Sequence, residues 1–166
     1  MDASHNPHAS HDAHAPDVTD PEAQPRPDPT AYLGFYLGEE LYGVPLDQLR
    51  EVARMSHLRR VPGAPPGVAG LVNLRGEILC ALDARTMLAS APQSDLETPF
   101  VVALRGFADP IGLVVDSIAD IYLVFPDEIG LPPVTWPAER AVCCIGTAEV
   151  PAGLMGLLDL NRLIKV

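Results

Sequence analysis

Several features are scarce in this sequence, and each shortage excludes a class of protein. Basic side chains number 11 against 22 acidic ones, for a formal net charge of −11. This balance argues against a nucleic-acid partner, because proteins that bind phosphate backbones carry a concentrated basic surface. No apolar run approaches the roughly 20 residues of a transmembrane helix, and the N-terminal residues lack the basic and apolar segments of a signal peptide. We therefore expect a soluble, cytoplasmic protein without direct membrane insertion.

Cysteine is also scarce: the chain has three, two of which are adjacent. Three cysteines, two of them neighbours in the chain, do not form a disulfide framework. We therefore expect the protein in a reducing compartment. A cysteine-dependent enzyme would need Cys143 or Cys144 as the nucleophile and His57 as its base. However, residues 142–145 predict a buried strand, in which cysteine acts as a small hydrophobic side chain. The folded part has no Gly-rich phosphate loop, paired catalytic carboxylates or Cys/His set with metal spacing, so we expect neither catalysis nor a cofactor or metal site there.

Residues 1–30 differ in composition from the rest of the chain. They contain six prolines and six acidic residues but no Leu, Ile, Phe, Tyr or Trp. Such a segment buries too little apolar surface to offset the entropy lost on ordering, so we predict a disordered tail and a folded part that begins near Ala31. Histidines at every third position of the tail allow weak capture of a transition metal, although a solvated His-rich tail is the simpler interpretation. These are His5, His8, His11 and His14.

After the tail, the patterning predicts a mainly β protein with short helices. Apolar alternation and turn residues divide the chain into short strands. The predicted strands are residues 32–37, 41–46, 55–61, 68–74, 77–82, 100–104, 111–115, 118–125, 142–148 and 154–158. Short helices are predicted after Asp47, Asp83 and Asp159, which suit the N-cap position. The first of these helices would bury Leu49, Val52 and Ala53 on one face.

The rest of the chain is organised around residues 68–88. Two apolar runs flank the pair Arg75–Gly76, which predicts a β-hairpin with its turn at that pair. Gly76 suits a backbone position with positive φ, so the turn would hold Arg75 in solvent. An arginine at the tip of a rigid hairpin is well placed for recognition.

The two halves of the folded part resemble each other. At a shift of 69, residues 42–47 match residues 111–116. At a shift of 76, Gly70 matches Gly146 and Asp83 matches Asp159. Since each copy alone is marginal in size, we predict two pseudo-repeated units, approximately residues 31–89 and 99–166, each closed into a small β-barrel. Packed together they would leave a groove that accepts a helix.

Four segments resemble the CheW-like family. They are LGEELYGVPLDQLREV from Leu37, GLVNLRG from Gly70, Leu82-Asp83 with Arg85, and GLVVDSIADI from Gly112, with weaker support from LLDLNRL near the C-terminus. The NLRG tetrapeptide is the most specific, and the resemblance spans residues 31–165. It implies two intertwined five-stranded β-barrels (SH3-like or OB-like) that share a core.

The resemblance also implies a function and a set of contact residues. Members of the family are non-catalytic adaptors that join the cytoplasmic tips of methyl-accepting chemoreceptors to the regulatory domain of a CheA-type histidine autokinase. No receiver domain is present, so a stand-alone adaptor in receptor arrays is expected, either in chemotaxis or in a chemosensory pathway with pili or another output. Carried over by position, the partner-binding residues are Leu49, Glu51, Gly70, Arg75 and Gly76. From the residues alone, Arg75 is better interpreted as an ordinary solvated turn residue. Leu49 is equally consistent with core packing, Glu51 with a solvated charge, and the two glycines with a purely conformational role.

Overall fold

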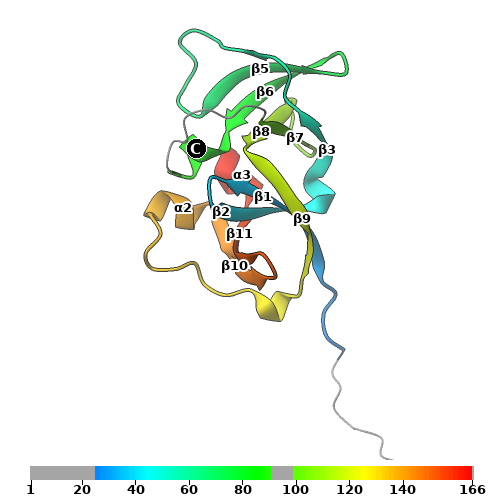
Figure 1. The fold of residues 1–166 in the computed structure, drawn as a ribbon, viewed down its shortest axis with the longest axis vertical. Coiled ribbons are helices and arrows are strands. Elements are labelled where there is room, and N and C mark those ends of the chain that lie inside the picture. The colour runs from blue at the N-terminus through cyan, green and yellow to red at the C-terminus, as the bar shows by residue number, and fades with distance from the viewer. Residues whose placement is uncertain (1–24, 91–98, 166) are drawn as a thin grey trace, which may run out of the picture.

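Two β-sheets carry most of the regular structure in the computed structural model, which describes residues 25–90 and 99–165 (Figure 1). Sheet A, in the lower half of Figure 1, has the strand order β10-β11-β2-β1-β9. Sheet B, in the upper half, has the order β3-β7-β8-β6-β5-β4. The strands of sheet A are β1 (Thr30–Leu37), β2 (Glu40–Pro45), β9 (Ser117–Val124), β10 (Cys144–Val150) and β11 (Gly153–Leu158). Those of sheet B are β3 (Leu49–Arg54), β4 (Leu58–Arg59), β5 (Val68–Leu74), β6 (Glu77–Asp83), β7 (Phe100–Leu104) and β8 (Ile111–Val115). The mainly β prediction is confirmed.

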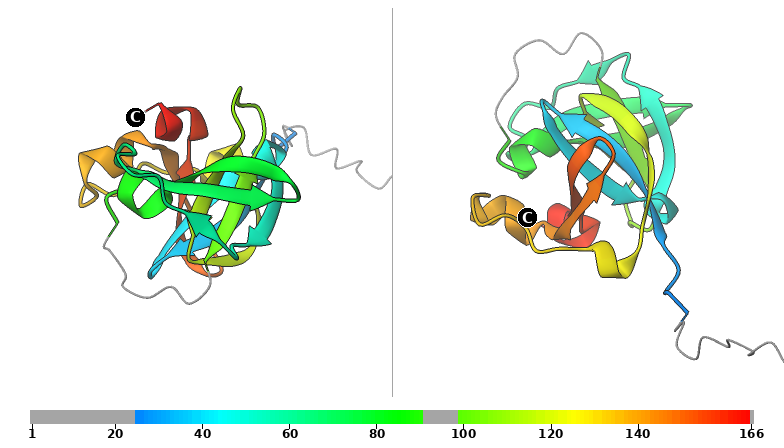
Figure 2. Two further views of the ribbon diagram at one scale, coloured as in Figure 1. Left: turned by 90° about the horizontal axis from the view of Figure 1, so that it is seen from above. Right: turned by 60° about the horizontal axis from the view of Figure 1, so that its bottom comes forward.

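Three short helices gather on one side of the sheets, as Figures 1 and 2 both show. They are α1 (Ala84–Met87), α2 (Ala138–Val142) and α3 (Leu160–Ile164); two 3-10 turns, Leu46–Gln48 and Pro126–Glu128, complete the regular elements. The predicted N-caps of α1 and α3 are present, because the Asp83 carboxylate accepts from Arg85 N and that of Asp159 accepts from Asn161 N, both at 3.0 Å. Within the described ranges no helix has the length and hydropathy needed to cross a membrane.

Neither sheet is built from one half of the chain. Strand β6 pairs in parallel with β8, and β11 pairs in parallel with β2, so each sheet contains strands from both sequence copies. The two parallel pairs are equivalent under the sequence repeat, since Cys80 lies opposite Ile111 and Gly156 lies opposite Tyr42. The strand exchange means that the halves intertwine, and neither can complete its sheet without the other.

Both sheets curl until their edges approach. The edge strands of sheet B, β3 and β4, are consecutive in the chain and are linked by residues 55–57. In sheet A, Gly130 follows β9 and exchanges two backbone hydrogen bonds of 2.8 and 2.9 Å with Thr147 of β10. The predicted barrels are therefore curled sheets whose edges, in the described part of the chain, meet through a short link or a single bridge.

The matched glycines permit this approach of the edges. A Cβ on Gly70 would lie 2.3 Å from the carbonyl oxygen of Arg59, and a Cβ on Gly146 would lie 2.6 Å from that of Gly130. Each glycine also follows a register shift in its strand pair. The same residue therefore does the same work in both copies: it lets a closing backbone pass over a bulged strand.

Three apolar layers fill the molecule. The largest lies between the sheets and includes Phe35 and Tyr42 from sheet A with Val102 and Leu113 from sheet B. Neighbouring residues point to opposite faces of a strand, so Val101 and Val114 pack on the other face of sheet B with Val72 and Ala81. A third layer joins Tyr32, Leu41, Met155 and Leu157 of sheet A. Because the central layer is shared, the two sheets form one folded unit.

The helix predicted after Asp47 is wrong. The chain makes only the 3-10 turn Leu46–Gln48 and then enters β3, which pairs antiparallel with β7. A bulge places Leu49 opposite Leu104 but Glu51 opposite Ala103, so two steps along β3 match one step along β7. Because of this extra residue, apolar side chains do not follow every second position of β3. The apolar residues Leu49, Val52 and Ala53 therefore have the spacing of a helix face. The strand predicted at residues 55–61 is also too long, since it is limited to the two residues of β4.

The predicted tail is only partly visible in the described residues. Its four histidines and residues 1–24 lie outside them, as do residues 91–98 of the connector between β6 and β7. Arg26 lies within the predicted tail, yet its Nη2 atom is 3.0 Å from Asp127 Oδ1 and 3.0 Å from Glu128 Oε1. Its guanidinium also lies 3.8 Å from the ring centroid of Phe125. The segment before β1 is therefore held against the 3-10 turn that follows β9.

A glycine substitution tests how sheet B closes. We expect Gly70→Ala to lower the free energy of unfolding by about 2–3 kcal/mol, because the new methyl group meets backbone that cannot rotate away. Urea unfolding followed by circular dichroism measures the loss. The control is Gly63→Ala, where φ is +75° but open space surrounds the site, so a cost of about 1 kcal/mol from the backbone alone is expected. Equal losses at the two positions would contradict a steric requirement at Gly70.

Candidate functional site

The tip of the β5–β6 hairpin presents Arg75 as predicted. Arg75 and Gly76 have φ values of 53° and 85°, the pair of positive values that a two-residue type I′ turn requires. The Asn73 side chain accepts a 2.9 Å hydrogen bond from Gly76 N and so fixes the turn. The Arg75 side chain is 83% exposed. A rigid turn thus holds a guanidinium in solvent at a defined place.

Four charged side chains surround this tip, and we call them the tip cluster: Arg50, Glu51, Arg75 and Glu77. Arg75 Nε lies 3.1 Å from Glu51 Oε2, and Arg50 Nη2 lies 3.5 Å from Glu51 Oε1. Arg50 also pairs with Glu77 on β6. The cluster therefore bridges the edge strand β3 and the hairpin tip, which are far apart in the order of sheet B. Its two positive and two negative charges balance.

Of the five predicted partner-binding residues, three belong to this region and two are built into the interior. Glu51, Arg75 and Gly76 lie together; Arg75 and Gly76 are exposed, and Glu51 is half-buried. Leu49 is 7% exposed and belongs to the central apolar layer. Gly70 is buried beneath Arg59. Leu49 and Gly70 therefore lie beneath the surface, while Glu51 and Arg75 place charged groups on it.

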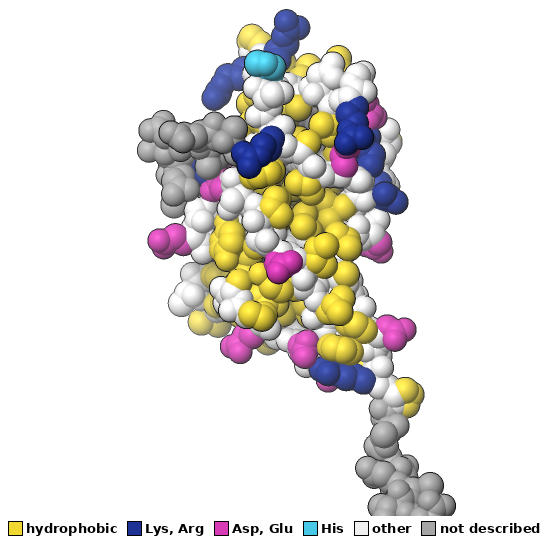
Figure 3. Space-filling model, turned by 45° about the vertical axis from the view of Figure 1, so that its right-hand side comes forward, with side chains coloured by type: hydrophobic (Ala, Val, Ile, Leu, Met, Phe, Trp, Pro, Cys, Tyr) yellow, Lys and Arg dark blue, Asp and Glu magenta, His cyan; other side chains and the backbone are white. Residues whose placement is uncertain are grey.

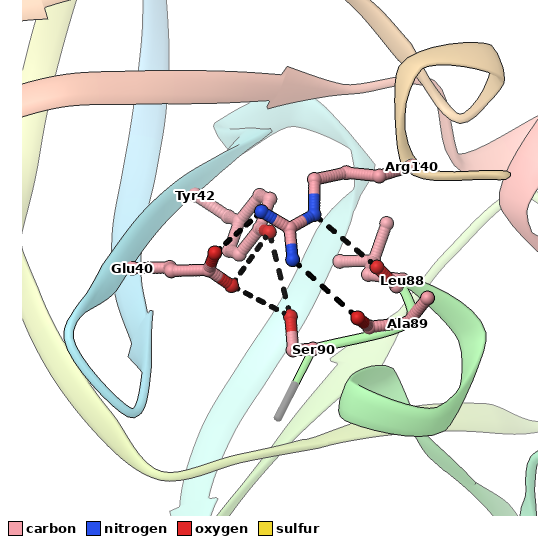
Figure 4. Close-up of polar contacts among 6 residues, drawn as sticks. All are labelled: Glu40, Tyr42, Leu88, Ala89, Ser90 and Arg140. Carbon is pink, nitrogen blue, oxygen red and sulfur yellow. Dashed lines mark hydrogen bonds and ion pairs between the residues drawn. The ribbon is translucent and has the colours of Figure 1, made fainter. Parts of the chain in front are cut away.

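A second polar cluster, drawn in Figure 4, was not anticipated from the sequence. Arg140 of α2 is 7% exposed and pairs with the Glu40 carboxylate at the start of β2. It donates from Nε to the Leu88 carbonyl at 3.3 Å and from Nη2 to the Ala89 carbonyl at 3.5 Å. The guanidinium therefore connects α2 to the C-terminal end of α1 and to sheet A. No local sequence pattern could have predicted this ion pair, because Arg140 and Glu40 are 100 residues apart in the chain.

Glu40 also organises two hydroxyl groups. Its Oε2 atom accepts from Ser90 Oγ at 2.8 Å and from the Tyr42 hydroxyl at 3.2 Å. Burial raises the pKa of Tyr42 to about 12, so this hydroxyl stays protonated and remains a donor over the physiological range. The Tyr42 ring lies 6.3 Å from that of Trp136, whose ring is in turn 5.5 Å from the Arg140 guanidinium. Aromatic and polar contacts together hold the segment that precedes α2.

A second buried ion pair connects Arg85 of α1 with Asp116, which lies between β8 and β9. Their side chains are only 11% and 8% exposed. Asp116 also accepts a hydrogen bond from Gly38 N in the turn between β1 and β2. Since Arg85 and Asp116 come from different halves of the chain, this pair reinforces the strand exchange.

An apolar groove lies on the helical side of the molecule. It has a volume of about 720 Å³ and is lined by α1, α2, α3 and the chain that enters β5. Its lining includes Val68, Leu82, Met87, Val142 and Ile164. The groove lies at the base of the β5–β6 hairpin, whereas the tip cluster lies at the other end. A groove is therefore present between sheet B and the helices, but it does not contain the predicted partner-binding residues, and its occupation by a helix stays a prediction.

An exposed apolar face covers the edge of sheet A. Strand β9 presents Ile121 and Leu123 at 53% and 64% exposure. Figure 3 shows hydrophobic side chains spread over the side of the molecule that β3 and β9 form. Large exposed apolar residues on an edge strand are typical of a surface that a partner covers.

The two adjacent cysteines do not have the surroundings of a nucleophile. Val142 ends α2 and is 60% exposed, so the predicted strand over residues 142–148 is wrong in its first two positions, and β10 begins at Cys144. Burial raises the pKa of Cys143 and raises that of Cys144 to about 12. A catalytic thiol needs the opposite shift. In the described ranges, no set of three or more His, Cys, Asp or Glu side chains is arranged to hold a metal ion.

Comparisons with known proteins agree on one family. A family model described as CheW-like domain matches residues 31–166. The chemotaxis protein CheW of Treponema pallidum is 27% identical over 135 residues, which cover 79% of each chain. That of Klebsiella aerogenes is 26% identical over 134 residues, 81% of each chain. The crystal structure of the scaffolding protein TtCheW from Thermoanaerobacter tengcongensis matches with a TM-score of 0.72 at 22% identity, over 83% of this chain and 94% of that chain. At this identity the structural match shows the fold alone.

The buried arginine of α2 generates a stability prediction. We expect Arg140→Ala to lower the free energy of unfolding by about 2–4 kcal/mol, because it leaves two carbonyls and a carboxylate without their shared donor. Arg140→Lys should recover little, since an ammonium cannot reach three acceptors as a planar fork does. Thermal and urea unfolding provide the measurement. Arg162→Ala is the matched control. The Arg162 side chain pairs with Asp159 but is 58% exposed, so its removal should lower the free energy of unfolding by roughly 0.5 kcal/mol. A loss at Arg140 no larger than at Arg162 would contradict the bracing role.

Proposed function

This chain belongs to the CheW-like family, and on that premise we propose that it is a non-catalytic adaptor for chemosensory signalling. It would couple the cytoplasmic tips of chemoreceptors to the regulatory domain of a CheA-type histidine autokinase. The observation that carries the proposal is the match of the family model to residues 31–166, all of the folded part. The names of the relatives, chemotaxis proteins and a scaffolding protein, support the same role. Such a protein would act in the cytoplasm, recruited to receptor arrays.

We place the receptor contact at the tip cluster. The Arg75 guanidinium is exposed, yet its backbone is fixed by the turn, so little conformational entropy is lost when it binds. A planar guanidinium can hold a receptor carboxylate through two hydrogen bonds or donate to the free carbonyls at the end of a helix. Glu51 already forms an ion pair with Arg75 and would keep the orientation of its guanidinium in the complex. In this proposal Leu49, Gly70 and Gly76 contribute by holding β3, β5 and the turn in place.

We place the kinase contact on an apolar face of a sheet. The Ile121 and Leu123 side chains of β9 supply exposed apolar surface away from the charged tip. Burial of such surface gives an interface that depends on area more than on charge. Separate faces for the two partners would allow one adaptor to hold both at once, which coupling requires.

The receptor contact is tested by Arg75→Ala. Removing an 83% exposed side chain should change the free energy of unfolding by no more than about 0.5–1 kcal/mol. Receptor binding should weaken by roughly 2–5 kcal/mol if the guanidinium makes a desolvated, charge-assisted contact. Arg75→Lys should rescue it poorly, because an ammonium is not a bidentate donor. The measurement is a titration of each variant against a receptor cytoplasmic fragment and, separately, against the kinase regulatory domain.

Two further variants make the receptor test specific. Arg105→Ala removes another exposed arginine, which lies between β7 and β8, and should leave receptor binding unchanged. Val142→Asp places a charge in the apolar groove at a side chain that is already 60% exposed. Wild-type receptor affinity for Arg75→Ala together with weak binding by Val142→Asp would move the receptor contact from the tip cluster to the groove. Kinase binding should be nearly unaffected by Arg75→Ala.

The kinase contact is tested by salt and by Leu123→Asp. An apolar interface predicts that affinity for the kinase regulatory domain changes less than about threefold between low and moderate salt. Leu123→Asp should weaken this binding by about tenfold or more, because a charge would have to be desolvated at the interface. Receptor binding is the internal control and should not change. A kinase complex that dissociates at moderate salt would point to charge pairing and contradict the apolar face.

A further inference from the structure

One stretch of this acidic chain carries only positive charge. From Val52 to Arg75 there is no Asp or Glu, although acidic residues outnumber basic ones by 22 to 11 overall. Arg54 at the end of β3, Arg59 in β4 and Arg60 after it are all exposed, as is His57 between the two strands. We call Arg54, His57, Arg59 and Arg60 the basic strip. Figure 3 shows basic side chains around a histidine at the upper end of the molecule.

The arginines of the basic strip differ in ion pairing from six of the other seven arginines, the exception being Arg105. Six arginines elsewhere have acidic partners within the protein: Arg26, Arg50, Arg75, Arg85, Arg140 and Arg162. No ion pair among the described residues involves Arg54, Arg59 or Arg60; Arg54 lies 5.2 Å from the ring centroid of Phe100, a cation–π distance. Within residues 25–90 and 99–165, three arginines of one short segment thus lack an acidic partner, although acidic groups are in excess in the protein.

We propose that the basic strip is an interaction surface for an acidic segment of a partner protein. The inference is independent of the proposed coupling role, because it rests on charge and not on the family. An extended polyanion is a poor ligand, since the net charge of −11 repels it beyond the strip. A short acidic segment meets only the local positive field. Val61, which is 41% exposed, adds an apolar contact next to Arg60.

The acidic N-terminal segment of this chain is a less suitable occupant than a separate molecule. The segment enters the described residues at the bottom of Figure 1, whereas β4 and β5 lie at the top. Arg26 is held there by Asp127, Glu128 and Phe125, so the chain leaves the fold at the far end from the strip. The partner we propose is therefore a second protein.

A purely structural role for these arginines makes a different prediction. Strand β4 has two residues and lies at the edge of sheet B, where charged side chains prevent pairing with another sheet edge. A charge of either sign serves that purpose, so Arg→Glu substitutions would be tolerated. Binding of an acidic segment depends on the sign of the charge, and charge reversal therefore separates the two roles.

The test uses the full chain and a fluorescent 12-residue peptide of alternating glutamate and alanine. We expect saturable binding that weakens about tenfold or more in the double variant Arg59→Glu/Arg60→Glu and with added salt. Arg59→Lys/Arg60→Lys keeps the charge and should stay within about threefold of wild type. Arg105→Glu is the control: it reverses one exposed arginine between β7 and β8, half the charge change of the double variant, and should change binding less than about twofold. Unfolding curves establish that each variant is folded, and Arg59→Gln/Arg60→Gln replaces the reversal if it is not.

Four results would overturn the proposal. The first is peptide affinity in the reversed variant equal to that of wild type, which leaves only the edge-protecting role. The second is equal weakening by Arg105→Glu, which would reduce the effect to net charge. The third is binding to vesicles of phosphatidylcholine and phosphatidylglycerol that needs the strip, without peptide binding, which would make the ligand a membrane surface. The fourth is a tenfold gain in peptide affinity when Asp12, Asp17 and Asp20 are changed to Asn, which would make the chain's own N-terminal segment the occupant.

Discussion

The exchange of strands between the two halves is the constraint on which the rest of this structure depends. Strands β6 and β11 each pair in parallel with a strand of the other half, and the largest apolar layer lies between the two sheets that result. A half of the chain on its own would leave these edges unpaired and this layer exposed, and a unit of that size buries too little surface to be stable. The buried pair of Arg85 with Asp116 crosses the same boundary. Folding and the placement of every surface discussed above therefore require both halves.

Strand exchange also explains why the surfaces are separated. The tip cluster lies at one end of the β5–β6 hairpin and the apolar groove at its base, while the face of β9 belongs to the other sheet. Arg140 holds α2 against α1, so the helical side is as well braced as the sheets. A protein whose task is to hold partners in fixed positions needs this rigidity. It needs no nucleophile or lowered pKa, and the buried cysteines have raised pKa values instead.

Charge is distributed in a way that fits several contacts. The tip cluster is neutral overall, the β9 face is apolar, and the basic strip is positive. Surfaces of different character recognise partners of different chemistry and discourage the wrong pairing. The net charge of −11 opposes non-specific association between copies of the protein.

Local sequence alone determined the features whose physics is local. The turn at Arg75–Gly76 and the N-caps Asp83 and Asp159 were predictable, because each depends on backbone conformation within a few residues. The match of Gly70 with Gly146 was also visible in the sequence, but the close approach of Arg59 and Gly130 that requires these glycines appears only in the fold. Apolar patterning predicted the mainly β architecture. The family resemblance added the intertwining of the two units and the partner-binding residues, whose contacts with partners stay a prediction. Tertiary structure decided the rest. Residues 49–54 became a strand and not a helix because β7 was available to pair with them, and a bulge hid the alternation.

The same holds for the long-range contacts. Glu40 and Arg140 are 100 residues apart, and Arg50 and Glu77 are 27 apart, so no sequence pattern links them. Only the curling of the sheets and the exchange of strands bring such side chains together. The basic strip shows both levels at once: its lack of acidic residues is plain in the sequence, but its lack of ion-pair partners among the residues that the structure describes is a result of the fold. The amino-acid composition determines which charged side chains the protein has, and tertiary packing determines which of them form ion pairs within it.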